Sequence, residues 1–381
     1  MPNSKSLAIA LTVAMSVVLG ATTSLAGAAS PAAKQIPVKI GMIESQTGSG
    51  ASSCLAEIPA AKAAIKVAQQ AGIAKQFAVS IDVQDDQSTP VGGVTAYRSL
   101  VNANVAAIVG PCVSSVTQGV VAFPAQDKIP MVLSDSSGPA FLDGTHPYVY
   151  GGGVSQSNYA VRTLSVLKQR GIKSTAVIVA SDNPTIEALW NTVLKPALAK
   201  NGIKLLGAFQ VVSGTVDYTA ELTKIKALHP ASIGLMGEPP DNVVIARQAR
   251  SFGMNQPFWS HLAAGVPVFQ SEPAASGTIF TTNWDPGFKY PSSVAFSKAV
   301  LAGSGTQPTV VSATGYDAML RLMYALNATG GKADPASINK ALKAQKGFAG
   351  AEGPLTINKF QALVGPGATV QIENGTTHIV G

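Results

Sequence analysis

Residues 105–119 read VAAIVGPCVSSVTQG, and this stretch contains the unit from which the fold prediction is built. The apolar run 105–109 predicts a short buried strand, which Gly110 and Pro111 end. Polar residues then lead into a predicted helix that begins near Ser115. The stretch therefore predicts a strand, a polar loop and a helix in that order.

The same unit recurs on both sides of this stretch. Strands are predicted at 38–43, 77–83, 105–109 and 129–133, and, after three glycines at 151–153, at 175–180, 203–211, 232–236 and 256–259. Segments with helical spacing of apolar residues lie between them. Strands that alternate with helices predict parallel sheets covered on both faces. Two such runs predict an α/β protein with two lobes, which the C-terminal remainder completes.

The N-terminus has the features of a secretory signal. Lys5 precedes an uncharged apolar run at 7–19, and the small residues 26–28 fit a cleavage site. The alternative is a membrane anchor, but the run is shorter than the roughly 20 residues that a spanning helix needs. We expect a signal peptide at 1–28, cleaved between Ala26 and Ser30. The mature chain is then a soluble periplasmic or secreted protein without a lipid anchor, since its first cysteine is Cys54.

Composition and charge favour a globular protein that does not bind nucleic acid. Hydrophobic residues make up 46% of the 381 residues, and charged residues only 12%. The formal net charge is +7, but the basic residues are scattered singly, without dense runs or interleaved aromatic residues. A solvated basic surface is therefore expected.

The sequence contains two cysteines, Cys54 and Cys112. In an exported chain, a pair of cysteines indicates one disulfide, whereas two unpaired thiols are the alternative. The two positions are far apart in sequence, so the fold would have to bring them together.

Motifs of enzymes are absent from the sequence. The TGSG segment at 47–50 lacks the third glycine of a dinucleotide-binding fingerprint, and no Lys-Ser/Thr pair completes a phosphate-binding loop. The four histidines show no metal-ligand spacing. We therefore expect no enzymatic activity, no cofactor and no metal.

In open parallel sheets, ligands bind beyond the carboxyl ends of the strands. That rule selects the loops at 44–54, 110–117, 134–138 and 181–185. Ser114 and Ser115 lie at the start of a predicted helix, where free N–H groups and the helix dipole favour an anion such as a carboxylate. The alternative is that Ser115 only caps the helix.

Six segments together resemble a known family. They are VKIGMIESQTG at 38–48, AAIVGPCVSSVTQG at 106–119, IPMVLSDSSGP at 129–139, ARQARSFG at 246–253, TGYDAMLRLMYAL at 314–326 and GPLTI at 353–357. Their order and spacing resemble the type I periplasmic binding proteins of the leucine/isoleucine/valine-binding family, over nearly all of the mature chain.

The resemblance implies an architecture. It predicts two Rossmann-like lobes with parallel sheets, joined by three crossovers, that close around a ligand. The N-terminal lobe would take 37–152 plus 283–353, and the C-terminal lobe 153–282 plus 354–381. A disulfide near the ends of the first and third strands also occurs in the family, which suits Cys54 and Cys112.

The resemblance also implies ligand contacts. The serine that holds the ligand carboxylate matches Ser114, and the two small or hydroxyl residues of the next loop match Ser136 and Ser137. The aromatic residue of the first loop falls near Ser53, so that wall of the site is missing. The second-lobe acid Asp182 is kept, although the residues after it differ.

Two further positions depart from the family pattern. Leu262 stands where the family has the acid that binds the ligand ammonium, and Glu238 stands at a tyrosine position. Either the ligand lacks an ammonium group or another acid has replaced that one. Glu238 is the first choice because it follows a second-lobe strand, and Asp182 is the second. The alternative is that Glu238 only caps the helix beginning near Asp241.

The resemblance predicts the solute-binding component of an ABC importer, which takes a small carboxylate such as a branched-chain or other amino acid. The alternatives are a binding protein for an aromatic or aliphatic organic acid or amide, and a ligand-sensing receptor subunit. The expected partners are the small-molecule ligand and the membrane permease subunits, with the protein itself a monomer.

Overall fold

The computed structural model describes residues 34–136 and 138–381, and one continuous unit runs from Gln35 to Gly381. The predicted signal peptide and Ser137 lie outside the described residues. None of the helices formed by the described residues is both long enough and apolar enough to cross a bilayer.

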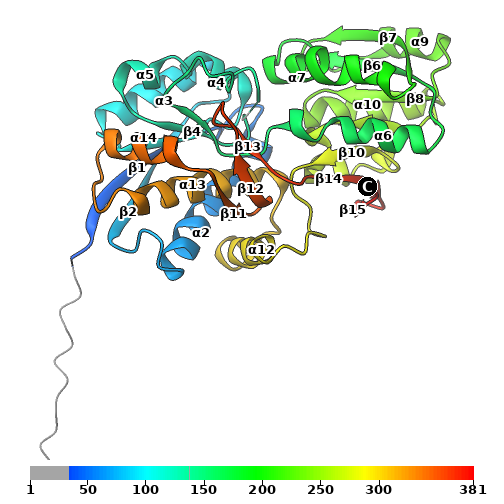
Figure 1. The fold of residues 1–381 in the computed structure, drawn as a ribbon. Coiled ribbons are helices and arrows are strands. Elements are labelled where there is room, and N and C mark those ends of the chain that lie inside the picture. The colour runs from blue at the N-terminus through cyan, green and yellow to red at the C-terminus, as the bar shows by residue number, and fades with distance from the viewer. Residues whose placement is uncertain (1–33, 137) are drawn as a thin grey trace, which may run out of the picture. The chain divides into compact units, whose positions relative to one another are not determined.

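The first sheet contains five parallel strands in the order β2-β1-β3-β4-β5 (Figure 1). They are β1 (Ile36–Glu44), β2 (Phe77–Asp85), β3 (Ala107–Val109), β4 (Met131–Leu133) and β5 (Val149–Gly151). Ile40 and Met42 of β1 pack in the same cluster as α2 (Glu57–Gln70) and α13 (Val310–Ala328). The next residue, Ile43, packs on the opposite face, because successive side chains of a strand alternate. That face is covered by the helices α3 (Pro90–Asn102) and α4 (Ser114–Val120).

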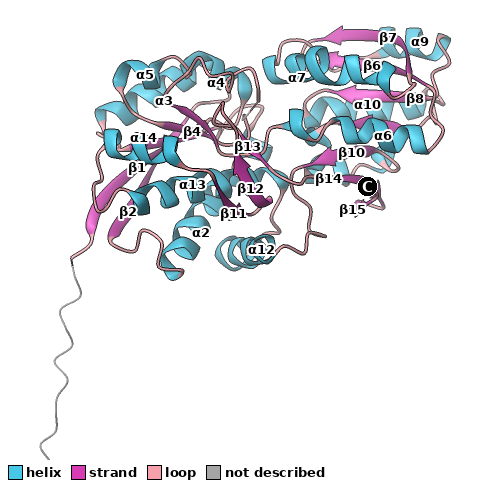
Figure 2. Ribbon diagram, viewed as in Figure 1, coloured by secondary structure: helices cyan, strands magenta, loops and turns pink. Residues whose placement is uncertain are grey.

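The second sheet contains seven strands in the order β15-β14-β10-β9-β8-β6-β7 (Figure 2). The parallel strands are β6 (Ser174–Ala180), β7 (Lys204–Val211), β8 (Ser232–Met236), β9 (Phe258–Ser260) and β10 (Ile279–Thr282). The antiparallel ones are β14 (Ala368–Glu373) and β15 (Thr376–Ile379). One face carries α6 (Val161–Gln169), α7 (Pro184–Leu189) and α8 (Lys195–Lys200), and the other carries α9 (Thr219–Ala227) and α10 (Pro239–Ser251).

The helical segment between β6 and β7 is interrupted. A π-helical turn at Trp190–Leu194 separates α7 from α8. Pro196 lies two residues beyond Leu194, and a proline has no N–H to donate to the preceding turn. The missing donor explains why α7 does not continue into α8 as one regular α-helix.

The remaining elements connect or extend the two sheets. The helices α12 (Pro291–Ser304) and α14 (Pro335–Ala344) pack with α2 and α13 beside the first sheet. A small antiparallel sheet contains β11 (Gly347–Gly350), β12 (Gly353–Ile357) and β13 (Leu363–Val364). Shorter helical turns are α1 (Ala51–Cys54), α5 (Phe123–Asp127), η1 (Gln156–Asn158), η3 (Leu262–Gly265), α11 (Pro267–Gln270) and η4 (Pro273–Ala275).

The described chain passes between the two sheets three times: after β5, after β10 and before β14. The predicted α/β fold with parallel sheets and three crossovers is therefore confirmed. The residue bounds of the two lobes stay a prediction. The helix α12 and the strands β5 and β10 were not predicted from the sequence, and the two strands are only 3 and 4 residues long.

Two glycines allow neighbouring chain segments to approach closely at the carboxyl ends of the strands of the first sheet. Gly110 follows β3 with φ at +94°, and a Cβ there would lie 2.2 Å from the carbonyl oxygen of Ile43 in β1. Gly152 begins the first crossover, and a Cβ there would lie 2.3 Å from the Cβ of Ala318 in α13. Any side chain at either position would push apart neighbours that the fold holds in contact.

The carboxyl group of Glu352 joins the first two crossovers. It accepts a hydrogen bond from the Val154 N–H at 2.7 Å, just after the first crossover begins. It also accepts one from the side-chain amide of Asn283, which directly follows β10. Glu352 itself lies between β11 and β12, where its own N–H donates to Asp317 of α13 at 2.9 Å. One buried side chain thus joins segments that are far apart in the sequence.

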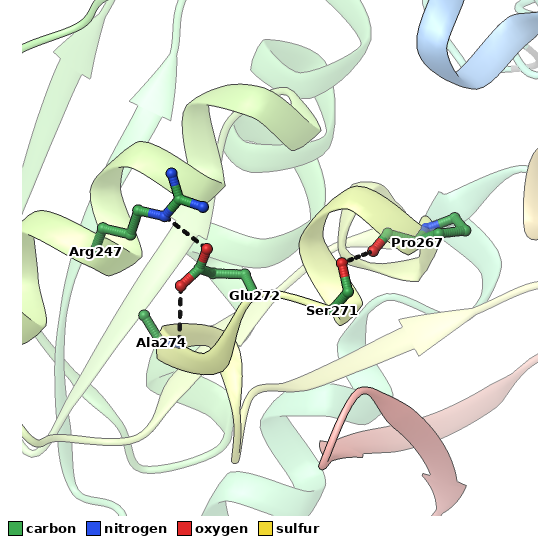
Figure 3. Close-up of polar contacts among 5 residues, drawn as sticks. All are labelled: Arg247, Pro267, Ser271, Glu272 and Ala274. Atoms are coloured by element: carbon green, nitrogen blue, oxygen red, sulfur yellow. Dashed lines mark hydrogen bonds and ion pairs between the residues drawn. The ribbon is translucent and has the colours of Figure 1, made fainter.

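In the second lobe, an ion pair holds the segment between β9 and β10 (Figure 3). Arg247 Nε lies 2.6 Å from Glu272 Oε2, and the other oxygen of Glu272 accepts a hydrogen bond from the Ala274 N–H at 3.1 Å. Ser271 Oγ donates to the Pro267 carbonyl at 2.7 Å. These bonds fix a segment that has little regular structure.

The predicted disulfide is confirmed, because Cys54 and Cys112 are bonded to each other with their Cα atoms 6.0 Å apart. Cys54 ends α1, which follows β1, and Cys112 lies in the loop after β3. These loops are neighbours because β1 and β3 pair directly in the sheet.

We predict that the Cys54→Ser/Cys112→Ser variant loses roughly 2–4 kcal/mol of unfolding free energy, since the bond closes a long loop. Denaturant titration measures this loss, with the reduced wild-type protein as the matched control. Thiol labelling of the unreduced, denatured wild type should find no free thiol. Two reactive thiols in that experiment would contradict the bond.

We also predict that Glu352→Ala lowers the free energy of unfolding by about 2–4 kcal/mol, because two buried donors on different crossovers lose their acceptor. Glu352→Gln is the matched control: it keeps one carbonyl oxygen as an acceptor and should be less destabilising. Denaturant titration of both variants tests this. Equal stability of the Ala variant and the wild type would show that the contact is dispensable.

Candidate functional site

A cavity of about 390 Å³ lies between the carboxyl ends of the two sheets. The first-sheet side contributes residues 49, 50, 53, 54, 88, 112–115 and 135, and the second-sheet side contributes 182, 183, 185, 186, 213, 214, 238–241, 261–263 and 266. Residue 156 and residues 310–311 come from the crossovers. Loops that follow parallel strands thus meet from both sides, at the place where such sheets bind ligands.

Six of the eight predicted site residues line this cavity. They are Ser53, Ser114, Ser115, Asp182, Glu238 and Leu262. Ser137 lies outside the described residues, and Ser136 is not among the lining residues. The cavity brings the six side chains together, although ligand contact by any of them stays a prediction.

Ser136 points its hydroxyl into the protein instead. Its Oγ donates to the Pro111 carbonyl at 2.7 Å and lies 2.7 Å from the Thr117 hydroxyl. The side chain is buried and ties the loop after β4 to the loop after β3. Sequence alone could not give this orientation, since a serine hydroxyl can turn toward either the cavity or the neighbouring loop.

The start of α4 presents hydrogen-bond donors to the cavity. The N-cap residue of this helix is Val113, and its side chain makes no capping bond. Ser114 and Ser115 are therefore the first two helical residues, and the alternative that Ser115 only caps the helix does not hold. Their N–H groups belong to the first turn, which has no intrahelical acceptor. Both serines line the cavity, so hydroxyl and N–H donors could bind a small anionic group there.

On the second-sheet side, two carboxyl groups are already engaged by the loop after β7. Asp182 Oδ1 accepts hydrogen bonds from the Ser213 N–H and hydroxyl, at 3.0 and 2.9 Å. Asp241 Oδ1 accepts one from the Gly214 N–H at 2.9 Å. These two acids line the cavity but also hold its wall in place.

Glu238 occupies the N-cap position of α10, yet its side chain makes no capping bond. Instead, Asn183 Nδ2 donates to its Oε1 at 2.6 Å, and the carboxyl group lines the cavity. The alternative that Glu238 serves only as a helix cap is thus not what the structure shows. Burial raises the pKa of this carboxyl, with a further rise from the charges of Asp241 and Asp182.

Asp135 is a lining residue that the sequence analysis missed. It follows β4, and its Oδ1 is buried without a hydrogen-bond partner. Burial raises the pKa of Asp135 to about 7, and the charge of Glu238 contributes to the rise. The signal was visible in the segment LSDSSG, where an acid stands among serines at a strand end, but only the serines matched the family pattern.

The far wall of the cavity is apolar and neutral. Leu262 lines it, and the N–H of Leu262 donates to Gln156 Oε1 at 3.3 Å. Burial lowers the pKa of His261 to about 4, so this imidazole is neutral. Its Nε2 lies 3.1 Å from the Gly237 carbonyl oxygen, to which a neutral imidazole can donate. The place of His261 in this wall was not predicted from the sequence, where the histidines were weighed only as metal ligands.

Buried acids also lie behind the disulfide. A carboxyl oxygen of Glu44 is within 4.8 Å of the sulfur atoms of Cys54 and Cys112. Because those sulfurs are bonded to each other, this group cannot act as a cysteine metal site. Burial raises the pKa of Glu44 well above its usual range, assisted by Glu57, and burial raises the pKa of Glu57 to about 8.

We predict that the ligand-free protein loses stability between pH 6.5 and pH 8. Carboxyls whose folded pKa is raised, such as Glu57 at about 8 and Asp135 at about 7, keep protons that the unfolded chain releases. Their contribution is therefore lost as the pH rises, by about 1 kcal/mol per pH unit for each fully buried group. His261 has the opposite effect, but only below its ordinary value of 6.5.

Denaturant titration across this pH range measures the slope. Glu57→Gln should make the slope shallower by about one proton, because a buried amide does not titrate. A wild-type stability that stays constant or rises between pH 6.5 and pH 8 would contradict the assignment of raised pKa values.

Comparisons with known proteins agree with this geometry. The sequence matches the family described as periplasmic binding protein over residues 37–377. It is 25% identical over 358 residues to the Leu/Ile/Val-binding protein homolog 3 of Brucella melitensis biotype 1, covering 92% of this chain and 94% of the relative.

Solved structures share the fold. The branched-chain amino acid transporter substrate-binding protein LivJ of Streptococcus pneumoniae, in complex with isoleucine, superposes with a TM-score of 0.81 at 21% identity, over 90% of this chain and 99% of that one. A solute-binding protein of an ABC transporter from R. palustris, in complex with benzoate, gives 0.80 at 18% identity, over 91% and 96%. On the family match and the shared fold, the chain belongs to the periplasmic binding protein family.

Proposed function

We propose that this protein is the extracytoplasmic solute-binding component of an ABC importer and binds a small carboxylate, such as a branched-chain or other amino acid. Its family and fold are those of solute-binding proteins, which are not enzymes. On this proposal, residues 1–28 direct export, and the mature protein is a soluble monomer that delivers its ligand to the membrane permease subunits.

The cavity between the two sheets is the observation that carries the proposal. Its volume of about 390 Å³ is in the range of small-molecule sites, and loops from both sheets line it. The first turn of α4 offers donors for a carboxylate, with the hydroxyls of Ser114 and Ser115 beside it. Val310, Val311 and Leu262 supply apolar surface for a side chain.

An aromatic or aliphatic organic acid, or an amide, is the second candidate ligand class. It is favoured by Leu262, which stands where the family has an ammonium-binding acid, and by the neighbour solved with benzoate. A ligand-sensing receptor subunit is the alternative role. Deleting the gene would abolish uptake of the ligand if the protein serves transport, and only the cellular response if it serves sensing.

A thermal-shift screen of the mature protein tests the proposal. Amino acids, aromatic acids, short-chain acids and amides form the panel, because a ligand that binds the folded state raises the melting temperature by mass action. We expect a small carboxylate to give the largest shift. If no compound of any of these classes shifts the melting temperature, the proposed ligand class is wrong.

For the best ligand from this screen, we predict that Ser114→Ala weakens binding by roughly 1–3 kcal/mol, since a hydrogen bond to a charged acceptor is lost. Isothermal titration calorimetry measures the change. Ser292→Ala, in the first turn of α12 and away from the cavity lining, is the matched control and should bind normally. An unchanged affinity in Ser114→Ala would mean that Ser114 is structural.

A further inference from the structure

The second sheet has a basic edge at the amino ends of its strands β6, β7 and β8, opposite the ends that border the cavity. Because these strands are parallel, α6, α8 and α9 run back along the sheet and end at this edge. Each of the three helices has a basic residue in its last turn. The segments 166–176, 196–207 and 222–234, which form the edge, contain no aspartate or glutamate. The cations that define the basic edge are Arg170, Lys173, Lys200, Lys204, Lys224 and Lys226.

The fold collects cations that stand singly in the sequence. The Lys204 N–H donates to the Lys173 carbonyl at 2.8 Å, so the starts of β6 and β7 lie side by side. Leu167, Leu198 and Ile203 pack in one cluster, so the ends of α6 and α8 meet behind these two strands. On the other face of the sheet, α9 ends just before β8, which pairs with β6. Three separate connections therefore present their positive charges on one surface.

The basic edge is exposed, and its charge is not neutralised within the protein. None of the six side chains forms an ion pair with another residue that the structure describes. Arg170 donates to the amide oxygen of Gln371 at 2.7 Å, and Lys226 donates to the Phe252 carbonyl at 2.7 Å, but both acceptors are uncharged. Glu373 lies in β14, and three strands of the sheet separate β14 from β6. The positive charge therefore faces the solvent and any partner.

Helix dipoles account for only part of this pattern. Cations are favoured in the last turn of any helix. In the first lobe, however, α2, α3 and α13 have no basic residue in their last turns. Lys173 and Lys204 also lie outside the helices, in the loop before β6 and at the start of β7. The basic edge is consequently a property of one surface rather than of every helix end.

We propose that the basic edge binds the surface of a bilayer that contains anionic phospholipid. Clusters of about four to eight lysines and arginines bind such surfaces, because the negative potential of the head groups attracts each cation that comes near them. Five of the six cations are lysines, whose ammonium groups bind phosphate without a fixed geometry. Leu228 is 39% exposed at the end of α9 and adds apolar surface, which a bilayer interface can take up and a soluble polyanion cannot.

Binding through this edge leaves the cavity open. The cavity lies at the carboxyl ends of the same strands, and none of the six cations lines it. A protein held at the bilayer in this way can still exchange its ligand, and it stays concentrated at a surface in which permease subunits are embedded. The inference extends the proposed solute-binding function but does not depend on which ligand the cavity takes.

Co-sedimentation with unilamellar vesicles tests the proposal. The protein is purified after export, so that an uncleaved apolar N-terminus does not contribute to binding. One set of vesicles is phosphatidylcholine with roughly one third phosphatidylglycerol, and the other is phosphatidylcholine alone. We expect binding to the anionic vesicles at about 50 mM salt and at least about tenfold weaker binding at about 300 mM salt, where the charges are screened. Vesicles of phosphatidylcholine alone should not bind the protein.

The variant Lys173→Gln/Lys200→Gln/Lys204→Gln should bind the anionic vesicles at least about 20-fold more weakly, because each lysine near the surface contributes about fivefold. The variant Lys173→Arg/Lys200→Arg/Lys204→Arg keeps the charges and should bind like the wild type. All three side chains are exposed, so both variants should keep the melting temperature of the wild type. A loss of binding in the arginine variant as large as in the glutamine variant would show that charge is not what binds.

The matched control is Lys62→Gln/Lys66→Gln/Lys75→Gln, which removes the same charge from exposed lysines of the first lobe. It should bind within about threefold of the wild type, because charges beyond a Debye length from the bilayer are screened. Equal losses in the control and the edge variant, or equal binding to uncharged vesicles, would overturn the proposal. Binding of poly-L-glutamate without binding of anionic vesicles would also overturn it, in favour of an acidic polypeptide. Ligand binding should be normal in every variant, which keeps this failure separate from failure of the proposed function.

Discussion

The carboxyl group of Glu352 is the constraint on which the two-lobed arrangement depends. It accepts hydrogen bonds from Val154 and Asn283, and its own N–H donates to Asp317, so two crossovers and α13 meet at one buried residue. Buried polar groups tolerate few alternative arrangements, because each lost partner leaves an unsatisfied donor. The crossovers are therefore fixed at their meeting point, and the loops at the strand ends remain free to differ in sequence.

The loops at the strand ends place acidic side chains around the cavity, although the molecule as a whole has a positive formal charge. The formal net charge is +7, but the acids Glu44, Glu57, Asp135 and Glu238 are placed around the cavity and behind the disulfide. Burial raises the pKa of every one of them, so these four carboxyls release their protons at a higher pH than ordinary carboxyls do. Net charge, which reports on the surface, consequently says little about the group that this site would bind.

Much of the fold could be predicted from the sequence because it is local. Runs of apolar residues such as 105–109, set between polar loops and helical spacings, determine where strands and helices alternate. Pairing of β1 with β3 then places Cys54 beside Cys112, and the strand-end rule gathers six of the eight predicted residues at one cavity. The short strands β5 and β10 were missed, although β3 and β4, which are as short, were predicted from the apolar runs that contain them.

The rest of the site depends on contacts that have no local signature. Val310 and Val311 reach the cavity only because the second crossover carries the start of α13 back to it, and their sequence resembles any helix start. Ser136 and Asp135 are adjacent in one loop, yet the hydroxyl turns inward to Pro111 whereas the carboxyl borders the cavity. Which of two neighbours faces a ligand is decided by backbone direction and tertiary partners. A resemblance transfers positions and residue types, but the acid Asp135, next to the matched serines, has no counterpart to transfer, and only the assembled loops show that it lines the same cavity as Glu238.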